Sequence, residues 1–443
     1  MRILWIVNIV FPKVCQKLGL AEPVSGGWLY ARAEQLRAVD GISLAVATVY
    51  KGNKAFKLDM DGIRYYLLPV DQLDKYQPCL EERWRETCAD FGPDLVHING
   101  TEYPHGLACM NALPHLKYAV SIQGLVSVIS RYYYGGMSFR EIARNTSLLE
   151  LVTGRSIWGS KRGMVKRGTY EFEYISRAHA ISGRTTWDLA HVRVANPSVP
   201  YYSSPRALRS VFYTSPTWNI DKMTPHTIFL SKGTSPFKGM HQVIKAVALL
   251  LPRYPDLQIR VAGKDMLGRS GWDSKLRITA YPRYLAKLAG RLGLRKHLYF
   301  TGRLTAQQMA AELLNANVFI CPSAIENSSN SIAEAQMLGV PTIASDAGGN
   351  MDMVEHGITG FIYRFEEHEL LAHFVARIFE ERELASRLSK AEIQAAGIRH
   401  EPKAGLQGDL RMYADLMDRG AFLSGEDSLT HCQEQTGRMQ RNS

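Results

Sequence analysis

The sequence has few cysteines and no long apolar run. Its 443 residues include six cysteines, without a C-x-x-C pair or a histidine array beside them, which argues against a disulfide framework and against a structural zinc site. We therefore expect a protein of the reducing cytoplasm. No segment reaches about 18 uninterrupted apolar residues, the length that a membrane-spanning helix needs. The opening MRILWIVNIVFP is too short for the apolar part of a signal peptide and predicts a buried first strand. The cysteines are Cys15, Cys79, Cys88, Cys109, Cys321 and Cys432.

Acidic residues are fewer than basic residues. There are 42 Asp and Glu against 53 Lys and Arg, which gives a formal net charge of +11. Such an excess calls for a negatively charged partner, which could be a phosphate-bearing substrate, an anionic membrane face or nucleic acid. The apolar content of 46% and the charged content of 21% are typical of a globular protein. The length predicts two domains.

Short β-rich runs alternate with helical patterns along the whole chain, such as the helical stretches 29–37, 240–250 and 305–315. This alternation predicts an α/β protein with parallel sheets covered on both faces, built as two doubly wound, Rossmann-like domains that face each other. The predicted strands are 3–10, 43–49, 63–68, 95–98 and 118–122 in the first unit, and 227–231, 258–262, 298–301, 318–321 and 342–344 in the second.

An irregular stretch rich in Ser, Pro and aromatic residues, between Tyr201 and Thr227, separates the two periodic units. After residue 423 the sequence is polar and patternless. The predicted organisation is an N-terminal acceptor-side domain at 1–205 with a basic insertion at 125–170, a C-terminal nucleotide-sugar domain at 206–395, a helix at 396–422 that packs back on the first domain, and a disordered tail at 423–443.

The insertion departs from the strand–helix pattern. Between 131 and 168 only Glu141 and Glu150 oppose eight basic residues, and aromatic side chains lie among them. Basic residues with interleaved aromatics suit an anionic membrane surface or a phosphorylated acceptor. A solvated insertion with some aromatics packed into the core is the alternative. The basic residues are Arg131, Arg140, Arg144, Arg155, Lys161, Arg162, Lys166 and Arg167, and the aromatics are Tyr132, Tyr133, Tyr134, Phe139 and Trp158.

The most specific pattern follows the predicted strand 318–321. Glu326 lies in a loop, Asn330 and Ser331 begin a helix, and Glu334 stands eight residues after the first glutamate. The unpaired N–H groups at a helix start suit phosphate oxygens. Hydroxyl-rich sugars suit the carboxylates, so Glu326 is expected to hold the transferred sugar and Glu334 the ribose.

Leu338-Gly-Val-Pro and a Gly-Gly pair at 348–349 complete this pattern. Here the chain resembles the retaining, GT-B-fold glycosyltransferases of the group 1 (GT4-like) family, whose signature is E-x7-E followed by G-x-P and a Gly-Gly turn. The resemblance covers nearly the whole chain and is sharpest from 227 to 363. It implies transfer of a hexosyl group from a nucleoside-diphosphate sugar to a glycan or lipid-linked acceptor with retention of anomeric configuration.

Other family landmarks occur in the right order. The resemblance assigns a donor-phosphate loop to Gly26 and Gly27, where only residues without side chains let the backbone come close. It assigns the clamp on the leaving diphosphate to Lys238, which with Glu326 forms the expected catalytic pair. It assigns the base-binding turn to Gly302 and Arg303, for which a plain surface turn is the alternative.

The chain also departs from the family. The family arginine of the second domain falls at Gly233, so Lys232 beside it is expected to replace that charge, without the bidentate fork of a guanidinium. The family histidine of the first domain is replaced by Gln123, which could still bond a substrate hydroxyl. His97 ends the preceding strand and is expected to face the cleft on the acceptor side. The alternative is a structural histidine.

Asp59 and Asp61 have the D-x-D spacing that other glycosyltransferases use to hold a divalent cation. Asp61-Gly62 is also a hairpin signal just before a strand, and we interpret the motif as a turn. We expect no metal and no cofactor, with the nucleotide sugar as the donor substrate.

The sequence therefore predicts a cytoplasmic hexosyltransferase of surface polysaccharide synthesis, at the inner face of the membrane if the segment 131–168 contacts anionic lipid. An epimerase of nucleotide sugars is the alternative enzyme. It acts without an acceptor, so the basic insertion would have no lipid or glycan partner. A nucleic-acid-binding protein is the alternative from the net charge, but no recognisable module for it occurs.

Overall fold

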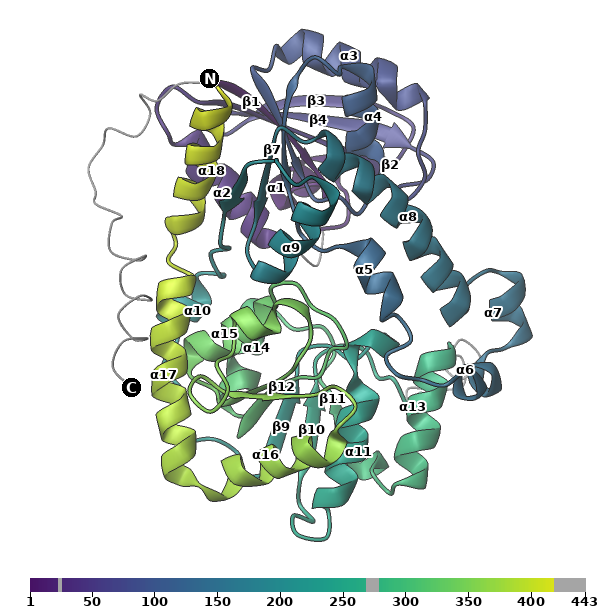
Figure 1. Cartoon of the computed structure of the whole chain (residues 1–443), viewed down its shortest axis with the longest axis vertical. Helices are drawn as coiled ribbons and strands as arrows, with labels where there is room; N and C mark the ends of the chain where they lie inside the picture. Colours follow the sequence, from purple (N-terminus) through teal and green to yellow (C-terminus); the bar gives the residue numbers. More distant parts are fainter. Residues whose placement is uncertain (23–25, 268–278, 418–443) are drawn as a thin grey trace.

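The computed structural model describes residues 1–22, 26–267 and 279–417, and these form two α/β domains, one above the other in Figure 1. Each domain has one sheet whose strands are parallel, apart from one antiparallel pair at an edge of the first sheet. The prediction of two facing, doubly wound domains is confirmed. The predicted tail at 423–443, Cys432, and Ser25, which directly precedes the predicted phosphate loop at Gly26 and Gly27, lie outside the described residues.

The first sheet has the strand order β3-β4-β2-β1-β5-β6-β7-β8. Its central strands are buried on both faces, as parallel strands between two helical layers must be. Helices α3 (Cys79–Phe91), α4 (His105–Ala112), α8 (Ile157–Arg177) and α9 (Thr186–Ala195) pack on one face, and α1 (Pro12–Leu18), α2 (Gly27–Arg37) and α18 (Ala404–Leu416) pack on the other. The strands are β1 (Arg2–Val7), β2 (Ser43–Lys51), β3 (Phe56–Met60), β4 (Ile63–Val70), β5 (Leu95–Asn99), β6 (Lys117–Ser121), β7 (Ala180–Gly183) and β8 (Tyr201–Ser203).

The second sheet has the order β11-β10-β9-β12-β13-β14. After β9 the chain builds outward on one side through β10 and β11, and then returns to the other side of β9 with β12. The strand order thus reverses between β9 and β12, which is where open parallel sheets form their binding crevice. The strands are β9 (Thr227–Leu230), β10 (Gln258–Val261), β11 (Leu298–Phe300), β12 (Val318–Cys321), β13 (Thr342–Ser345) and β14 (Phe361–Tyr363).

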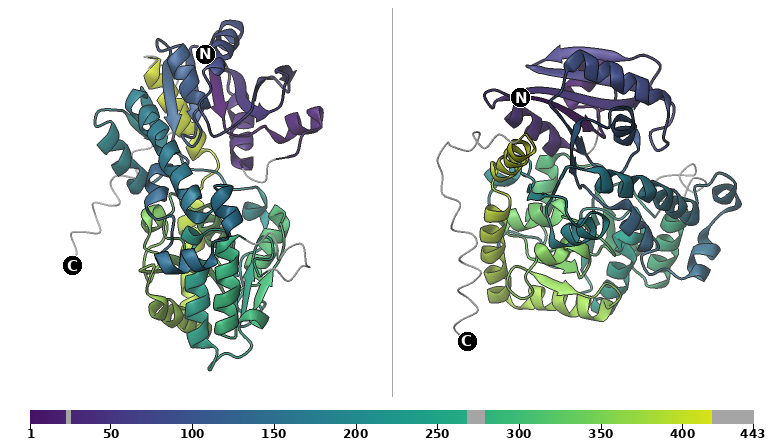
Figure 2. Two further views of the ribbon diagram at one scale, coloured as in Figure 1. Left: turned by 90° about the vertical axis from the view of Figure 1, so that its right-hand side faces the viewer. Right: turned by 45° about the horizontal axis from the view of Figure 1, so that its top comes forward.

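Helices connect these strands and cover both sheets (Figures 1 and 2). In the first domain they are α1 (Pro12–Leu18), α2 (Gly27–Arg37), α3 (Cys79–Phe91), α4 (His105–Ala112), α5 (Val126–Arg131), α6 (Phe139–Asn145), α7 (Leu148–Val152), α8 (Ile157–Arg177) and α9 (Thr186–Ala195). The rest of the described chain contributes α10 (Val211–Thr214), η1 (Pro236–Lys238), α11 (Met240–Leu250), α13 (Ala280–Arg291), η2 (Arg295–His297), α14 (Ala306–Leu314), α15 (Asn330–Leu338), η3 (Gly348–Asp352), α16 (His368–Glu380), α17 (Arg382–Arg399) and α18 (Ala404–Leu416).

The insertion forms helices α5 to α8, which leave the first domain and reach the second (Figure 1). His241 on α11 contacts the carbonyl oxygen of Gly135 at 2.8 Å, and the hydroxyl of Tyr284 on α13 donates to Glu141 at 3.0 Å. The backbone N–H of Ala280 donates to Glu150 at 2.8 Å. Both acidic residues of the segment 131–168 are therefore engaged by the second domain.

The chain then returns to the first domain at its C-terminal end. Helix α17 runs along the second domain and α18 packs on the first, on one side of the molecule in Figure 1. Arg32 of α2 and Asp409 of α18 form an ion pair of 2.9 Å, with side chains 3% and 5% exposed. The hydroxyl of Tyr413 accepts from the indole N–H of Trp5 at 3.0 Å and contacts a ring nitrogen of His97.

The expected strands all occur, with β1 ending at Val7 rather than at residue 10. The strands β3, β7, β8 and β14 were not expected. Asp61 and Gly62 have φ of 51° and 75°, which is the left-handed conformation of a type I′ hairpin turn between β3 and β4. Asp59 pairs with Arg64 and Asp61 pairs with Lys13, so the D-x-D motif is the predicted turn.

No helix in the part of the chain that the structure describes is long and apolar enough to cross a membrane. The cysteines of that part, Cys15, Cys79, Cys88, Cys109 and Cys321, are free thiols.

The buried ion pair that anchors α18 gives a test of this packing. Asp409→Ala leaves the Arg32 guanidinium buried without its carboxylate, so we expect the unfolding free energy of the first domain to fall by about 3–5 kcal/mol in urea denaturation. Asp415→Ala, on the exposed side of the same helix, should cost less than about 1 kcal/mol. Equal losses in the two variants would show that the pair does not anchor the helix.

Candidate active site

A cavity of about 280 Å³ lies between the domains at the carboxyl ends of β9 and β12. Gln123, Gly124 and Ile129 line it from the first domain, and the loops after β9 and β12 line it from the second. This is the reversal point of the second sheet, where the topology predicts a ligand site. We refer to it as the interdomain pocket.

The loop after β9 brings Lys238 into this pocket. It ends in the short helix η1, and Gly239 follows with φ of +71°, a conformation that L side chains rarely adopt. A Cβ at Gly239 would also overlap the carbonyl oxygen of Pro322 in the neighbouring loop. Glycine is therefore required for the lysine loop to lie against the end of β12.

The loop after β12 holds Glu326 in the same pocket, and the Gly-Gly pair of the sequence pattern supports it. The backbone N–H of Gly349 donates to the carbonyl of Glu326 at 3.1 Å. A Cβ at Gly348 would overlap that carbonyl, and one at Gly349 would overlap the carbonyl of Asn327. The two glycines act through backbone contact with the glutamate loop.

Lys238 and Glu326 form an ion pair across the pocket, and each side chain is 17% exposed. Ser323 donates its hydroxyl to the same carboxylate oxygen at 2.8 Å. Burial lowers the pKa of the Lys238 ammonium, but the charge and hydrogen bond of Glu326 outweigh it, and the net shift of the pKa is upward. The lysine is therefore held in its charged form.

Two further cations line the pocket. Burial, followed by the nearby Lys238 charge, lowers the pKa of Lys232, although the Glu326 carboxylate opposes this. Arg206 comes from the irregular linker, and its guanidinium lies 4.1 Å from the centre of the Trp28 ring and 3.5 Å from Oδ1 of Asn330. Among the described residues that line the pocket, three are cations and one is a carboxylate, which favours an anionic ligand.

Helix α15 begins at the pocket. Ser329 is its N-cap and accepts from the N–H of Ile332, and Asn330 and Ser331 line the cavity. The first N–H groups of such a helix and its positive dipole end suit an anion. The structure brings together Lys232, Lys238, Glu326, Asn330, Ser331 and Gln123 of the predicted site.

Hydrogen bonds between the domains complete the site. The hydroxyl of Thr185 donates to Oδ1 of Asn327 at 2.7 Å, and Thr186 donates its N–H and hydroxyl to Asp352 at 2.6 and 2.7 Å. The amide of Asn327 donates to the carbonyl of Gln123 at 3.4 Å. The glutamate loop is therefore positioned by both domains.

Glu334 lies one helical turn deeper in α15 and does not line the interdomain pocket. Arg209 donates to one of its oxygens from Nε at 3.1 Å and from Nη2 at 2.8 Å. Burial raises the pKa of this carboxyl, and the arginine opposes the shift. A ribose role for Glu334 stays a prediction, and it would require a ligand hydroxyl to share this carboxylate with Arg209.

The predicted base-binding turn lies at the end of β11. Gly302 has φ of +77° and pairs with Gly263 across a β-bridge, while Arg303 is exposed. Neither lines the interdomain pocket, and their role stays a prediction. Gly26 has φ of +93° and caps α2, which starts at Gly27 and presents Trp28 to Arg206.

The expectation that His97 faces the cleft is wrong. His97 is 1% exposed, and its ring nitrogens contact the hydroxyl of Tyr413 and, at 2.7 Å, that of Ser121. Burial lowers its pKa to about 4, so the ring is neutral at physiological pH. It is a structural histidine that ties β5 to α18.

The sequence interpretation missed Arg206, Ser323 and Asn327. Ser323 lies three residues before Glu326 and Asn327 directly follows it, and their small polar side chains were a usable signal. Arg206 comes from a stretch without periodicity, and nothing local marks it as a pocket residue. Among the described residues no group of three or more His, Cys, Asp or Glu could hold a metal ion.

Comparisons with known proteins find similar sequences and similar folds. Residues 216–395 match the family model of glycosyl transferases group 1. A D-inositol 3-phosphate glycosyltransferase of Streptomyces griseus subsp. griseus is 33% identical over 156 residues, which cover 35% of this chain and 32% of that protein. The chain spans about a third of the length of the first curated relatives that it matches.

Solved structures match over nearly the whole chain. Sucrose-phosphate synthase from Thermosynechococcus elongatus is 16% identical with a TM-score of 0.67, and the match covers 94% of this chain and 99% of that one. Anabaena Alr3699/HepE in complex with UDP and glucose is 15% identical with a TM-score of 0.62, at the same coverage of 94% and 99%. The predicted GT-B fold is confirmed.

Proposed function

We propose that this chain, whose residues 216–395 belong to the glycosyl transferases group 1 family, transfers a hexosyl group from a nucleoside-diphosphate sugar to a glycan or lipid-linked acceptor. One observation carries the proposal: Lys232, Lys238 and Arg206 all line the interdomain pocket together with Glu326. Among the described residues that line the pocket, Glu326 is the only carboxylate. The excess positive charge fits a diphosphate, and Glu326 fits the hydroxyls of a sugar.

The leaving diphosphate is held by charge and by backbone amides. Lys238 now pairs with Glu326, and a bound diphosphate would compete for its ammonium and free the carboxylate for the sugar. The N–H groups at the start of α15 add donors aimed at the same region. Fixed positive groups at the departing oxygens stabilise the charge that builds up as the bond to the sugar breaks.

Retention follows if the acceptor attacks the face that the diphosphate leaves. The bond from the anomeric carbon to the phosphate oxygen breaks, and the acceptor oxygen bonds to that carbon. The acceptor proton passes to an oxygen of the departing diphosphate. Glu326 orients the sugar in this scheme and forms no covalent bond to it. The neighbour solved with UDP and glucose makes UDP-glucose the first donor to test.

We further propose a peripheral contact with an anionic membrane through the segment 131–168, at the cytoplasmic face and in surface polysaccharide synthesis. Leu148, Leu149 and Val152 of α7 are 81%, 68% and 86% exposed. Arg140, Arg144, Arg155 and Lys166 are exposed nearby in the chain. Only Glu141 and Glu150 oppose the basic residues of the segment 131–168, and both accept hydrogen bonds from the second domain. Apolar tips flanked by basic residues suit a headgroup layer.

Glu326→Gln tests the catalytic assignment. We expect the release of nucleoside diphosphate to slow about 100-fold or more, since the charged partner of the sugar is lost. Nucleotide binding should stay at wild-type strength or become tighter because the variant removes the competitor for Lys238. The sugar nucleotide is the one that most raises the melting temperature in a panel of UDP-, GDP- and ADP-sugars. Glu383→Gln, exposed on α17, is the matched control.

Turnover within twofold of wild type would remove Glu326 from the mechanism. Nucleotide release that does not depend on an acceptor, with an epimerised sugar as the product, would favour the epimerase instead. Inversion at the anomeric carbon, read by NMR of the product, would contradict the same-face scheme.

Vesicle sedimentation tests the membrane contact. The protein should bind phosphatidylglycerol vesicles and not phosphatidylcholine vesicles, because only phosphatidylglycerol carries a net negative charge. About 0.1 M salt screens charges over about 10 Å, so only basic residues close to the membrane surface contribute. The triple variant Arg140→Gln, Arg144→Gln, Arg155→Gln should lose at least about tenfold in affinity. The exposed triple Lys51→Gln, Lys390→Gln, Lys403→Gln controls for net charge. An equal loss of vesicle affinity in both triple variants would show that the protein is attracted by its net charge and not through the segment 131–168.

A further inference from the structure

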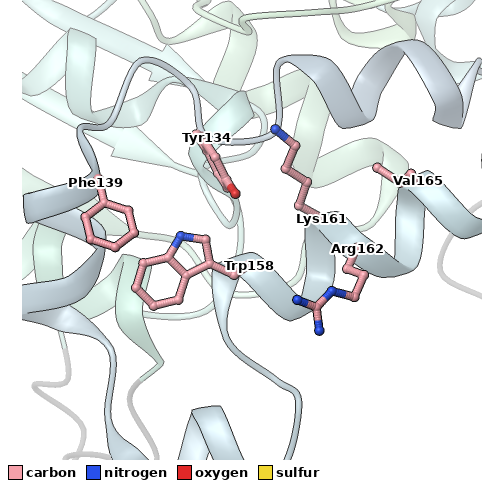
Figure 3. Close-up of a pocket in the computed structure, with 6 residues that line it drawn as sticks. All are labelled: Tyr134, Phe139, Trp158, Lys161, Arg162 and Val165. Carbon is pink, nitrogen blue, oxygen red and sulfur yellow. The ribbon is translucent and has the colours of Figure 1, made fainter.

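A second hollow, of about 460 Å³, opens within the insertion, away from the interdomain pocket (Figure 3). It lies between the segment before α6, the start of α6 and the first half of α8. We call it the insertion hollow. Its lining residues are Tyr134, Phe139, Trp158, Lys161, Arg162 and Val165.

The walls of the insertion hollow are aromatic and aliphatic. The rings of Phe139 and Trp158 lie side by side, with centroids 5.3 Å apart and planes inclined by 36°. Phe139 is 72% exposed and Val165 is 51% exposed. Large apolar side chains gathered around one exposed concavity are typical of a binding surface, whereas single exposed ones are ordinary. The shape and lining favour an apolar ligand.

The polar atoms of the hollow are mainly donors. Lys161 places its ammonium 4.2 Å from the centre of the Tyr134 ring, and the Arg162 guanidinium lies at the opposite side of the hollow in Figure 3. The described residues that line it include no carboxylate and no amide side chain. Sugar hydroxyls need acceptors as well as donors, so this lining suits an anion attached to an apolar chain better than a sugar.

The insertion hollow shares a wall with a third hollow, which lies beside the glutamate loop. Tyr134 also lines a neighbouring hollow with Arg131 and Arg364, which lies against Ala324 in the glutamate loop. Helix α5 separates that hollow from the interdomain pocket, since Ile129 faces the pocket and Arg131 the hollow. Arg131 and Arg364 share that hollow with Asp346 and Glu366, and Arg364 pairs with Glu366 at 3.8 Å.

We propose that the insertion hollow binds the hydrocarbon chain of a phosphate-bearing lipid acceptor, with Lys161 and Arg162, at its two sides, as the cations available to the phosphate. This assignment rests on the proposed function and gives its acceptor a chemical class. The acceptor's sugar end would lie at the interdomain pocket, and its chain would leave the protein beside the exposed tip of α7, whose Leu148 is 81% exposed.

Isothermal titration with monomeric decyl phosphate, below its micelle concentration, tests the hollow directly. We expect one site per chain and binding at least about tenfold tighter than for decyl glucoside or for inorganic phosphate, because the probe has both the chain and the charge. Val165→Asp and Phe139→Ala should each weaken decyl phosphate at least tenfold. The double variant Lys161→Gln, Arg162→Gln should remove the preference for decyl phosphate over decyl glucoside.

The matched controls come from the same helix. Phe172→Ala and Lys166→Gln remove an exposed aromatic and an exposed cation of α8 outside the hollow, and both should bind decyl phosphate as wild type does. Equal weakening in the controls, binding of several probe molecules per chain, or hollow variants that lose vesicle binding and keep probe binding would each overturn the proposal.

Two readouts separate this proposal from the proposed function. Glu326→Gln should bind decyl phosphate as the wild type does. If the wild type binds decyl phosphate but transfers no sugar, the proposed transferase activity is contradicted and the proposed binding in the hollow is not. When transfer to a lipid-linked acceptor is measured, decyl phosphate should raise the KM for that acceptor and not for the sugar nucleotide, and Val165→Asp should abolish this inhibition. Inhibition against the sugar nucleotide would place the probe in the interdomain pocket and overturn the assignment.

Discussion

The ion pair between Lys238 and Glu326 is the contact on which the rest of the site depends. Its two residues come from loops 88 positions apart in the chain, and the adjacency of β9 and β12 brings those loops together. Glycines let the backbones approach: Gly239 lies against Pro322, and Gly348 against the carbonyl of Glu326. A side chain at either glycine would push the lysine and the carboxylate apart.

Contacts between the domains make the site a joint product of both. Thr185 donates a hydrogen bond to Asn327 beside Glu326, and the insertion contacts α11 and α13 on the other side. Helix α18 crosses back and holds the first domain through Asp409. Lys232, Lys238 and Glu326 come from the second domain, while Gln123 and Ile129 in the first domain face them, so the proposed reaction between two substrates would require this docking.

Much of this arrangement follows from sequence pattern because parallel strands, helix starts and glycine turns have local signatures. Glu326 and the start of α15 were predicted for that reason, whereas Lys238 was predicted from the resemblance to the group 1 family. The short strands β7, β8 and β14 have three or four residues each and show no alternation to recognise. His97 was misjudged because its partner Tyr413 is 316 residues away, and Arg206 was missed because it comes from an irregular linker.

The central claim is that the positive charge of the interdomain pocket holds a diphosphate. It is tested most directly by comparing UDP with uridine as ligands of the wild type and of Lys238→Met in calorimetry. A charge-assisted contact to phosphate is worth about 1.5–3 kcal/mol, so the variant should bind UDP about 10- to 100-fold more weakly and uridine equally well. A variant that binds UDP as tightly as the wild type would contradict the account.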